Sequence, residues 1–390
     1  MTDTIKIESA VFIWLFNTSG CTNEEIKKLL PKTLESKIDA WLNGSRSPEL
    51  TISQIQTLAD TYHRPFASFL LSEVPDGEII PRDFRKNPDA QPFSKETFRY
   101  FRQAYNDLKI YREMSENLNE EHLKTIRRYS KDDDPEKTAQ KERELLNIPA
   151  DLHWKNENEA YKYWREFITD NGIPVFQYSM PQNEARGFVV RIGDYAAIIT
   201  NSKDHIFSRI FTIFHEYAHL LIGEECVCME NSDESENPQI RQVENWCNQF
   251  AGAFLMPKES IHNIPKIDTL LQSGKTIDAA AKISSIFKVS KTAALVRLNK
   301  LGLITSTQYK NGYSILNPEE EEEEEEEKTQ KEKTSGFVPP EDKCIHEKGV
   351  KYITLIERNY NEGHITQADR IRSLNVSQKT AEKVAAKVGL

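Results

Sequence analysis

Two histidines and a glutamate near the middle of the chain have the spacing of a metal-binding helix, in the run His215-Glu216-Tyr217-Ala218-His219. Side chains four residues apart on a helix lie on the same face, so both imidazoles can reach one zinc ion. Glu216 follows the first histidine, where its carboxylate can accept a proton from a water molecule at the metal. The spacing therefore predicts a catalytic zinc site with Glu216 as general base.

The residues around this motif are apolar on nearly every side of the expected helix, which we place at residues 208–222. They are Ile210, Phe211, Ile213, Phe214, Leu220, Leu221 and Ile222. Burying polar groups without partners is costly, and one metal ion would satisfy both histidines and the glutamate. The alternative is a buried helix whose histidines bond to carbonyl groups.

A catalytic zinc ion needs a third protein ligand and an open position for water. The acidic and cysteine side chains that follow the motif are Glu224, Glu225, Cys226, Cys228, Glu230, Asp233, Glu234, Glu236 and Glu244. We predict Glu244, because it lies on a second helix, expected at 240–256, and a packed helix holds a ligand more rigidly than a loop does. Cys226 and Cys228 could bind a metal of their own, but two cysteines do not fill four positions.

These two helices together resemble the ImmA/IrrE family of metallopeptidases, which pairs an HExxH helix with a later helix reading E-x-x-A-N-x-F-A. The resemblance lies in FTIFHEYAHLL at residues 211–221, ENWCNQFA at 244–251 and LMP at 255–257. It is specific over residues 158–260 and weaker over 276–302, and Cys247 stands where the family usually has alanine. The resemblance implies a zincin-like fold in which His215, His219 and Glu244 bind zinc and Glu216 is the general base.

The parts of the site that would meet a substrate are less well defined by the sequence. Tyr195, Tyr217 and His262 are candidates for stabilising the oxyanion, and no spacing favours one of them. In zincins an edge strand usually aligns the substrate by β-addition. Strands are expected at residues 174–178, 186–192 and 195–200, and we predict the last of these as the edge strand from its order along the chain.

Residues 1–75 are expected to form several short helices. Trp41-Leu42-Asn43-Gly44, Pro48, Leu58-Ala59 and the run from Arg64 to Leu71 resemble a helix-turn-helix domain of the phage-repressor type. Pro81-Arg82-Asp83-Phe84-Arg85 resembles the connector that follows such a domain. The expected recognition helix spans residues 33–42, and its candidate DNA contacts are Thr33, Ser36 and Lys37.

The charge of this N-terminal region does not favour DNA binding over another role. Residues 1–75 contain seven Lys/Arg and nine Asp/Glu, a net charge of −2, and the expected recognition helix also carries Glu35 and Asp39. Binding to phosphates needs a basic face. A specific DNA reader and a scaffold that docks a protein partner therefore stand as equal alternatives.

The whole chain is predicted to be an α+β protein that is mostly helical. The expected units are a repressor-like domain at 1–75, a helical connector at 76–157, a metallopeptidase domain at 158–305, an acidic linker at 306–336 and a small helical module at 337–390. The net charge is −10, but nine consecutive glutamates at 319–327 account for most of it, since −10 + 9 = −1. The folded parts are thus nearly neutral.

The composition predicts a cytoplasmic protein. No apolar run approaches the roughly 18 residues of a membrane span, and five scattered cysteines are typical of reduced thiols rather than of a disulfide framework. The resemblance implies a regulatory zinc endopeptidase that cleaves a small helix-turn-helix repressor or an antitoxin, with DNA as a second partner left open. The alternatives are a DNA-binding regulator whose metal is structural, and a component of a toxin–antitoxin or phage-defence system.

Overall fold

The computed structural model describes residues 3–75, 93–120, 126, 128–149, 151–223, 227–228, 238–317 and 338–390. Helices dominate these residues, and the strands form one sheet of two strands and one of four. The predicted α+β, mostly helical fold class is confirmed. Within the described part of the chain, no helix combines the length and the apolar character needed to cross a bilayer.

The N-terminal region packs around a core of its own, which includes the buried rings of Phe12 and Trp41. Its elements are β1 (Thr4–Lys6), α1 (Ser9–Asn17), α2 (Asn23–Leu29), α3 (Lys32–Leu42), β2 (Glu49–Thr51), α4 (Ile52–Tyr62) and a 3-10 helix η1 (Phe66–Leu70). The Thr22 side chain accepts a hydrogen bond from the Glu25 amide, and the Glu25 side chain accepts one from the Thr22 amide, so a capping box begins α2.

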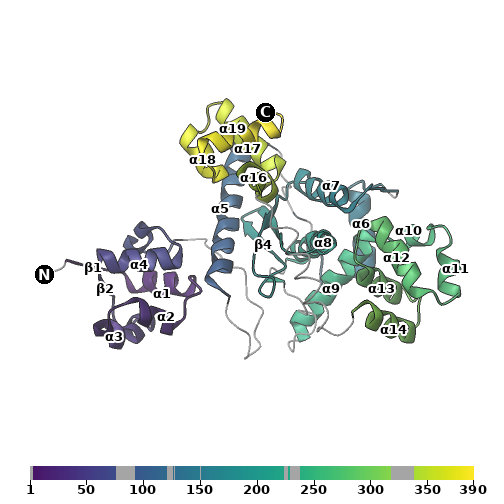
Figure 1. Ribbon diagram of the computed structural model, residues 1–390, viewed down its shortest axis with the longest axis horizontal. Coiled ribbons are helices and arrows are strands. Elements are labelled where there is room, and N and C mark those ends of the chain that lie inside the picture. Colours follow the sequence, from purple (N-terminus) through teal and green to yellow (C-terminus); the bar gives the residue numbers. More distant parts are fainter. Residues whose placement is uncertain are drawn as a thin grey trace.

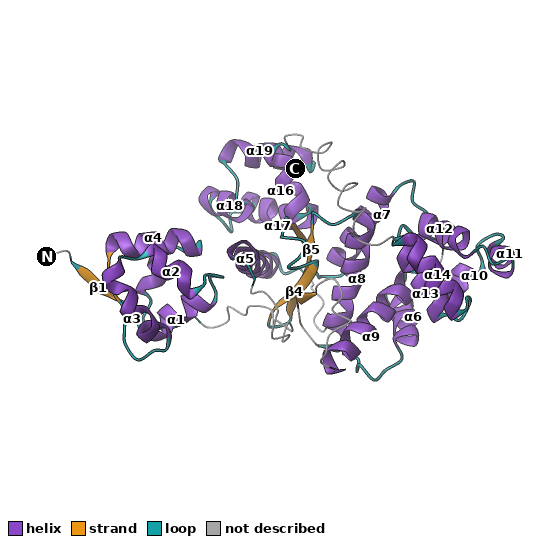
Figure 2. Cartoon of the chain, turned by 60° about the horizontal axis from the view of Figure 1, so that its bottom comes forward, coloured by secondary structure: helices purple, strands orange, loops and turns teal. Residues whose placement is uncertain are grey.

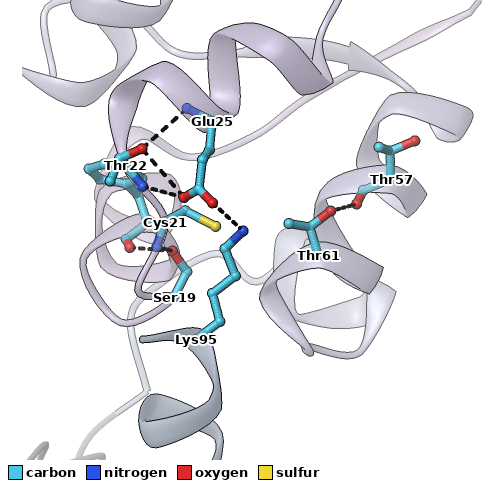
Figure 3. A network of polar contacts seen from close by, with 8 residues as sticks. Ser19, Cys21, Thr22, Glu25, Thr57, Thr61 and Lys95 are labelled. Carbon is cyan, nitrogen blue, oxygen red and sulfur yellow. Dashed lines mark hydrogen bonds and ion pairs between the residues drawn. The ribbon is translucent and has the colours of Figure 1, made fainter. Parts of the chain in front are cut away.

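The long helix α5 (Lys95–Asn117) connects this region to the rest of the molecule. Lys95 forms an ion pair of 2.8 Å with Glu25 of α2, which Figure 3 shows beside the capping box. Arg102 donates hydrogen bonds of 2.6 Å to the Thr18 carbonyl and 3.0 Å to the Tyr62 carbonyl. The guanidinium of α5 thus satisfies carbonyl groups at the ends of α1 and α4, where helical carbonyls have no helical partner.

The four-stranded sheet has the order β3 (Val175–Tyr178), β5 (Tyr195–Asn201), β4 (Gly187–Ile192), β6 (Val227–Cys228). β5 is parallel to β3 and antiparallel to β4, so it lies inside the sheet. The prediction that residues 195–200 form the edge strand is therefore wrong. All seven residues of β5 are buried, and such a run without alternation is typical of an interior strand.

One face of this sheet is covered by α8 (Ile206–Ile222), which in turn packs on α7 (Glu157–Asp170) and α9 (Pro238–Leu255). The helix α6 (Pro135–Leu145) also packs on α9. Trp164 of α7 contacts Phe214 of α8 edge-on, with ring centroids 4.8 Å apart. In Figure 1 the sheet lies between α8 on one side and α5 on the other.

The opposite face of the sheet is covered by α5 and by the C-terminal helices α16 (Pro340–Lys348) and α17 (Val350–Asn361), which pack with α18 (Gln367–Leu374) and α19 (Gln378–Lys387). Lys348 forms a buried ion pair with Asp107 of α5. Arg165 of α7 donates hydrogen bonds of 2.7 Å to the His346 carbonyl and 3.0 Å to the Glu347 carbonyl. The C-terminal helices therefore share a core with the sheet.

A second helical group follows α9 and comprises α10 (Lys258–His262), α11 (Ile267–Gln272), α12 (Thr276–Phe287), α13 (Lys291–Lys300) and α14 (Ser306–Leu316). Helices α12 and α13 occupy the region 276–302 where two short helices were expected. Helix α14 occupies residues that were assigned to the acidic linker at 306–336, so the start of that range is helical instead. The glutamate run itself lies outside the described residues.

Candidate metal centre

The first helix of the site, α8, begins after His205, whose Nδ1 accepts a hydrogen bond from the Phe207 amide. It ends at Gly223, which has the left-handed conformation (φ 73°) that favours glycine at a helix end. Every residue from Thr212 to Leu221 is buried. The apolar flanks of the motif thus place two histidines and a glutamate inside the protein.

The second helix, α9, packs along α8 through stacked rings, and the centroids of Phe214 and Phe254 are 4.4 Å apart. This packing directs Glu244 toward the two histidines. The Glu244 Oε2 lies 3.2 Å from His215 Nε2, and its Oε1 lies 3.4 Å from His219 Nε2. The two imidazole Nε2 atoms are 3.1 Å apart. The three sequence-predicted ligands therefore meet at one point.

This donor set fits zinc by its chemistry and its surroundings. His215, His219 and Glu244 are buried, and one ligand atom from each lies within 4.8 Å of the others. Two imidazoles and a carboxylate are a known catalytic zinc set with a fourth position left open. The predicted loop alternatives, among them Glu224, Cys226, Cys228 and Glu230, lie where the structure describes no side chains.

The charge state of Glu244 suits a metal ligand. Burial alone would raise the pKa of this carboxyl, but the charge of His219 and the hydrogen bonds of both histidines outweigh burial and hold the pKa well below its usual range. Glu244 is therefore ionised at neutral pH and ready to bind a cation.

Asn248 is a residue of the site that the sequence reasoning missed. It lies four residues after Glu244, on the same face of α9, and its Oδ1 is 2.9 Å from His215 Nδ1. Because an amide oxygen only accepts, the His215 Nδ1 carries the proton and leaves Nε2 to bind a metal. The sequence did contain a signal for this role, because Asn248 is a second polar residue on the same helical face as the predicted ligand Glu244.

The general base predicted at Glu216 is fully buried and lies against Gly187 at the start of β4. A Cβ atom added at Gly187 would lie 2.9 Å from Glu216 Oε1 and 2.4 Å from the Thr212 side chain. Only glycine leaves room here for the strand to pass so close to the carboxylate. Gly187 is thus a second residue of the site that the sequence reasoning missed.

A cavity of about 990 Å³ gives access to the centre, and His215 and Glu216 line it together with Thr212 and Asn248. The oxyanion candidates Tyr195, Tyr217 and His262 are not among the residues lining this cavity. The Tyr217 hydroxyl instead donates a buried hydrogen bond of 2.7 Å to Glu142 of α6.

The predicted DNA contacts are far from this centre in the fold. Thr33, Ser36 and Lys37 lie on α3 of the N-terminal region, with Thr33 and Ser36 exposed and Lys37 half-buried. The structure does not bring them together with the metal centre, and their role remains a prediction.

A comparison with known protein families bears directly on this centre. Residues 168–299 match the IrrE N-terminal-like domain of peptidase family M78. The chain carries a metallopeptidase domain of the ImmA/IrrE family. The match covers the sheet strands β3 to β5 and helices α8, α9, α12 and α13, and so confirms the family resemblance for this region. No curated protein matches the chain.

Proposed function

We propose that this ImmA/IrrE-type domain is a zinc-dependent endopeptidase that acts on a regulatory protein, namely a small helix-turn-helix repressor or an antitoxin, in the cytoplasm. One observation carries the proposal. Two histidines and a glutamate meet at a buried point, and Glu216 lies beside them on a cavity wall. A metal site that is only structural has no need of a general base.

The chemistry divides between the metal and the chain. When bound by His215, His219 and Glu244, zinc supplies a Lewis acid that polarises a carbonyl group and lowers the pKa of water. Glu216 accepts the proton of the attacking water and then passes it to the leaving amine. Asn248 orients the His215 ring through its Nδ1.

A polypeptide substrate, rather than a single amino acid, suits the size of the site. The cavity of about 990 Å³ is at the upper end of the usual range for ligand pockets, about 300–1,000 Å³. It continues from the metal centre past Phe207 of α8 to Tyr313 of α14. An endopeptidase needs such an extended site, because the substrate chain continues on both sides of the scissile bond.

The N-terminal region is proposed to recruit the substrate by protein contact. Its net charge is −2, and the recognition-helix candidate α3 exposes Glu35 beside Thr33 and Ser36. A DNA-binding face gains much of its affinity from neutralising phosphates, whereas a protein-docking face can be neutral. A DNA-binding regulator with a structural metal is the competing function.

The proposal is tested by expressing the intact protein and its Glu216→Gln variant in the native cells and comparing the proteomes by mass spectrometry. We expect new cleavage fragments of a small regulatory protein with the wild-type enzyme and none with the variant. The variant should still contain zinc and should capture the uncut substrate. Identical proteomes, with zinc bound in both proteins, would argue against the peptidase function.

A further inference from the structure

The cavity beside the metal centre has an aromatic wall that leads to a metal ligand. Phe207, Phe211 and His215 are spaced four residues apart on α8 and all three line the cavity. The rings of Phe211 and His215 have centroids 6.4 Å apart. Phe207 and Phe211 are half-buried, whereas the residues from Thr212 to Leu221 are buried. The first two turns of α8 therefore present apolar surface next to the reacting centre.

Helices α13 and α14 also contribute apolar and aromatic residues to the lining of this cavity. Val296 of α13 lines the cavity with Tyr309 and Tyr313 of α14, whose ring centroids are 5.8 Å apart. Gly312 allows α14 to approach this closely, because a Cβ there would lie 3.0 Å from the Leu295 side chain. Apolar and aromatic side chains from two parts of the fold thus line one cavity, which suits a bulky apolar side chain of a ligand.

Charged side chains of both signs line the cavity, namely Asp134, Glu136, Arg186, Glu216, Lys258, Arg297 and Lys300. Arg297 and Glu136 neutralise each other through hydrogen bonds of 2.5 and 2.6 Å. The Asp134 carboxylate accepts hydrogen bonds from the first amides of α6. Lys258 and Lys300 also line the cavity and are exposed, and no ion pair involves either of them in the described part of the chain. Lys258 and Lys300 thus offer two exposed ammonium groups to a substrate carboxylate, and Asp134 places one exposed carboxylate on the same cavity.

We propose that this cleft selects polypeptide segments that carry a bulky apolar or aromatic side chain next to the scissile bond and an acidic side chain further along. The apolar side chain packs between Phe211 and Tyr313, and the acidic one meets Lys258 and Lys300 at the rim. This inference rests on the proposed peptidase function, because it assigns the substrate class of the same site.

The inference is tested with a library of peptides that vary in charge and apolar residues, incubated with the zinc-loaded, full-length protein. Cleavage sites are read by mass spectrometry. We expect cuts next to Phe, Tyr, Leu or Met in acidic peptides. Reversing both lysines, Lys258→Glu with Lys300→Glu, should lower kcat/KM for acidic peptides by about tenfold or more, and the effect should shrink at high salt. Lys310→Glu, an exposed lysine of α14 outside the cavity wall, is the matched control.

A second pair of variants tests the contribution of the aromatic residues that line the cavity. Tyr313→Ala should reduce kcat/KM for peptides with a bulky apolar residue by about 10–200-fold and have less effect on peptides with alanine there. Ile315→Ala, at an exposed position of the same helix, should leave both unchanged. Cleavage without preference, or a preference for basic peptides, would overturn the inference.

A binding experiment separates this inference from the peptidase proposal. The same peptides, labelled with a fluorophore, are titrated with the Glu216→Gln protein. Acidic, apolar peptides that bind but are never cut by the wild type would support the cleft and contradict the peptidase function. Equal affinity for acidic and basic peptides would contradict the cleft, whether or not peptides are cut.

Discussion

The site residues predicted from the sequence lie in two regions of the molecule, and their surroundings differ. In the α8–α9 pair, side chains from both helices converge on one buried point, where His215, His219 and Glu244 lie within 4.8 Å of each other. In the N-terminal region, Thr33 and Ser36 lie exposed on the single helix α3. In the first arrangement the Nε2 atoms of both histidines and both Glu244 oxygens contact one another, whereas in the second the side chains face solvent.

The contrast shows when a sequence pattern determines a site. Polar residues on an apolar helix must find partners inside the protein, because burying them alone is costly. Their chemistry can therefore be predicted from the helix. Polar residues on an exposed face are already satisfied by water, so the same residues fit a DNA contact, a protein contact or neither.

The largest expected effect is at the converging pair. His219→Ala removes one of two imidazoles, and the purified protein should lose nearly all of its zinc by elemental analysis. His262→Ala, a half-exposed histidine of α10 outside the cavity wall, should retain full zinc content. Unchanged zinc in the His219 variant would break the comparison by showing that the buried centre is not the metal site.

The third ligand is tested in the same way. Glu244→Ala should sharply lower zinc affinity in a chelator competition, because a buried carboxylate ligand is lost. Glu230→Ala and Cys226→Ala, which change the loop alternatives, should leave the affinity unchanged. Loss of zinc from the Cys226 variant, with zinc retained in the Glu244 variant, would assign the third ligand to the loop.

A smaller effect is expected at Asn248, which contacts the ligand His215 rather than the metal. Asn248→Leu leaves His215 without its Nδ1 partner and should weaken zinc binding by about 10–100-fold. Asn248→Asp should restore most of the affinity, because a carboxylate also accepts from Nδ1. Asn245→Leu, which changes another amide on the cavity wall, is the control. Equal zinc affinities in all three variants would show that Asn248 does not position the ligand.

A still smaller effect, independent of the metal, is expected where the N-terminal region contacts α5. Arg102→Ala removes hydrogen bonds to the ends of α1 and α4 and should cost about 1–3 kcal/mol of docking free energy. Hydrogen exchange should then increase at the contact with α5, with zinc content unchanged. Arg99→Ala, whose ion pair with Glu96 is exposed, should change neither quantity. Faster exchange throughout residues 238–317 would instead indicate coupling to the catalytic unit.

The smallest effect is predicted at the exposed helix. The triple change Thr33→Ala, Ser36→Ala and Lys37→Ala should leave zinc content and stability unchanged and should have little effect on DNA binding. The measurement is a gel shift with the full-length Glu216→Gln protein on DNA upstream of its own gene. Tight, salt-sensitive and sequence-specific binding that the triple change abolishes would show that α3 reads DNA after all.

Features that depend on local sequence could be predicted, whereas features that depend on contacts between distant segments could not. Helix α8 and its three polar residues were predictable, because polar residues with this spacing between apolar flanks are buried and one metal ion can serve as their common partner. The place of β5 was not, because order along the chain does not determine order in a sheet. Asn248 and Gly187 were missed, since a lone amide or glycine has many ordinary roles. Residues 337–390 were predicted only as a small helical module, because nothing in their sequence identifies the sheet as the partner of α17.

The packing of helices on the sheet face opposite α8 has a consequence for biosynthesis. That face packs against α5, which precedes the peptidase domain in the chain, and against α17, which follows it. The core is therefore complete only after the ribosome has released α17, which follows β5 by about 150 residues. A nascent chain that already contains the HExxH motif still has an incompletely covered sheet. The complete core is thus restricted to chains that extend through α17, and products truncated before it expose an apolar face to chaperones and proteases.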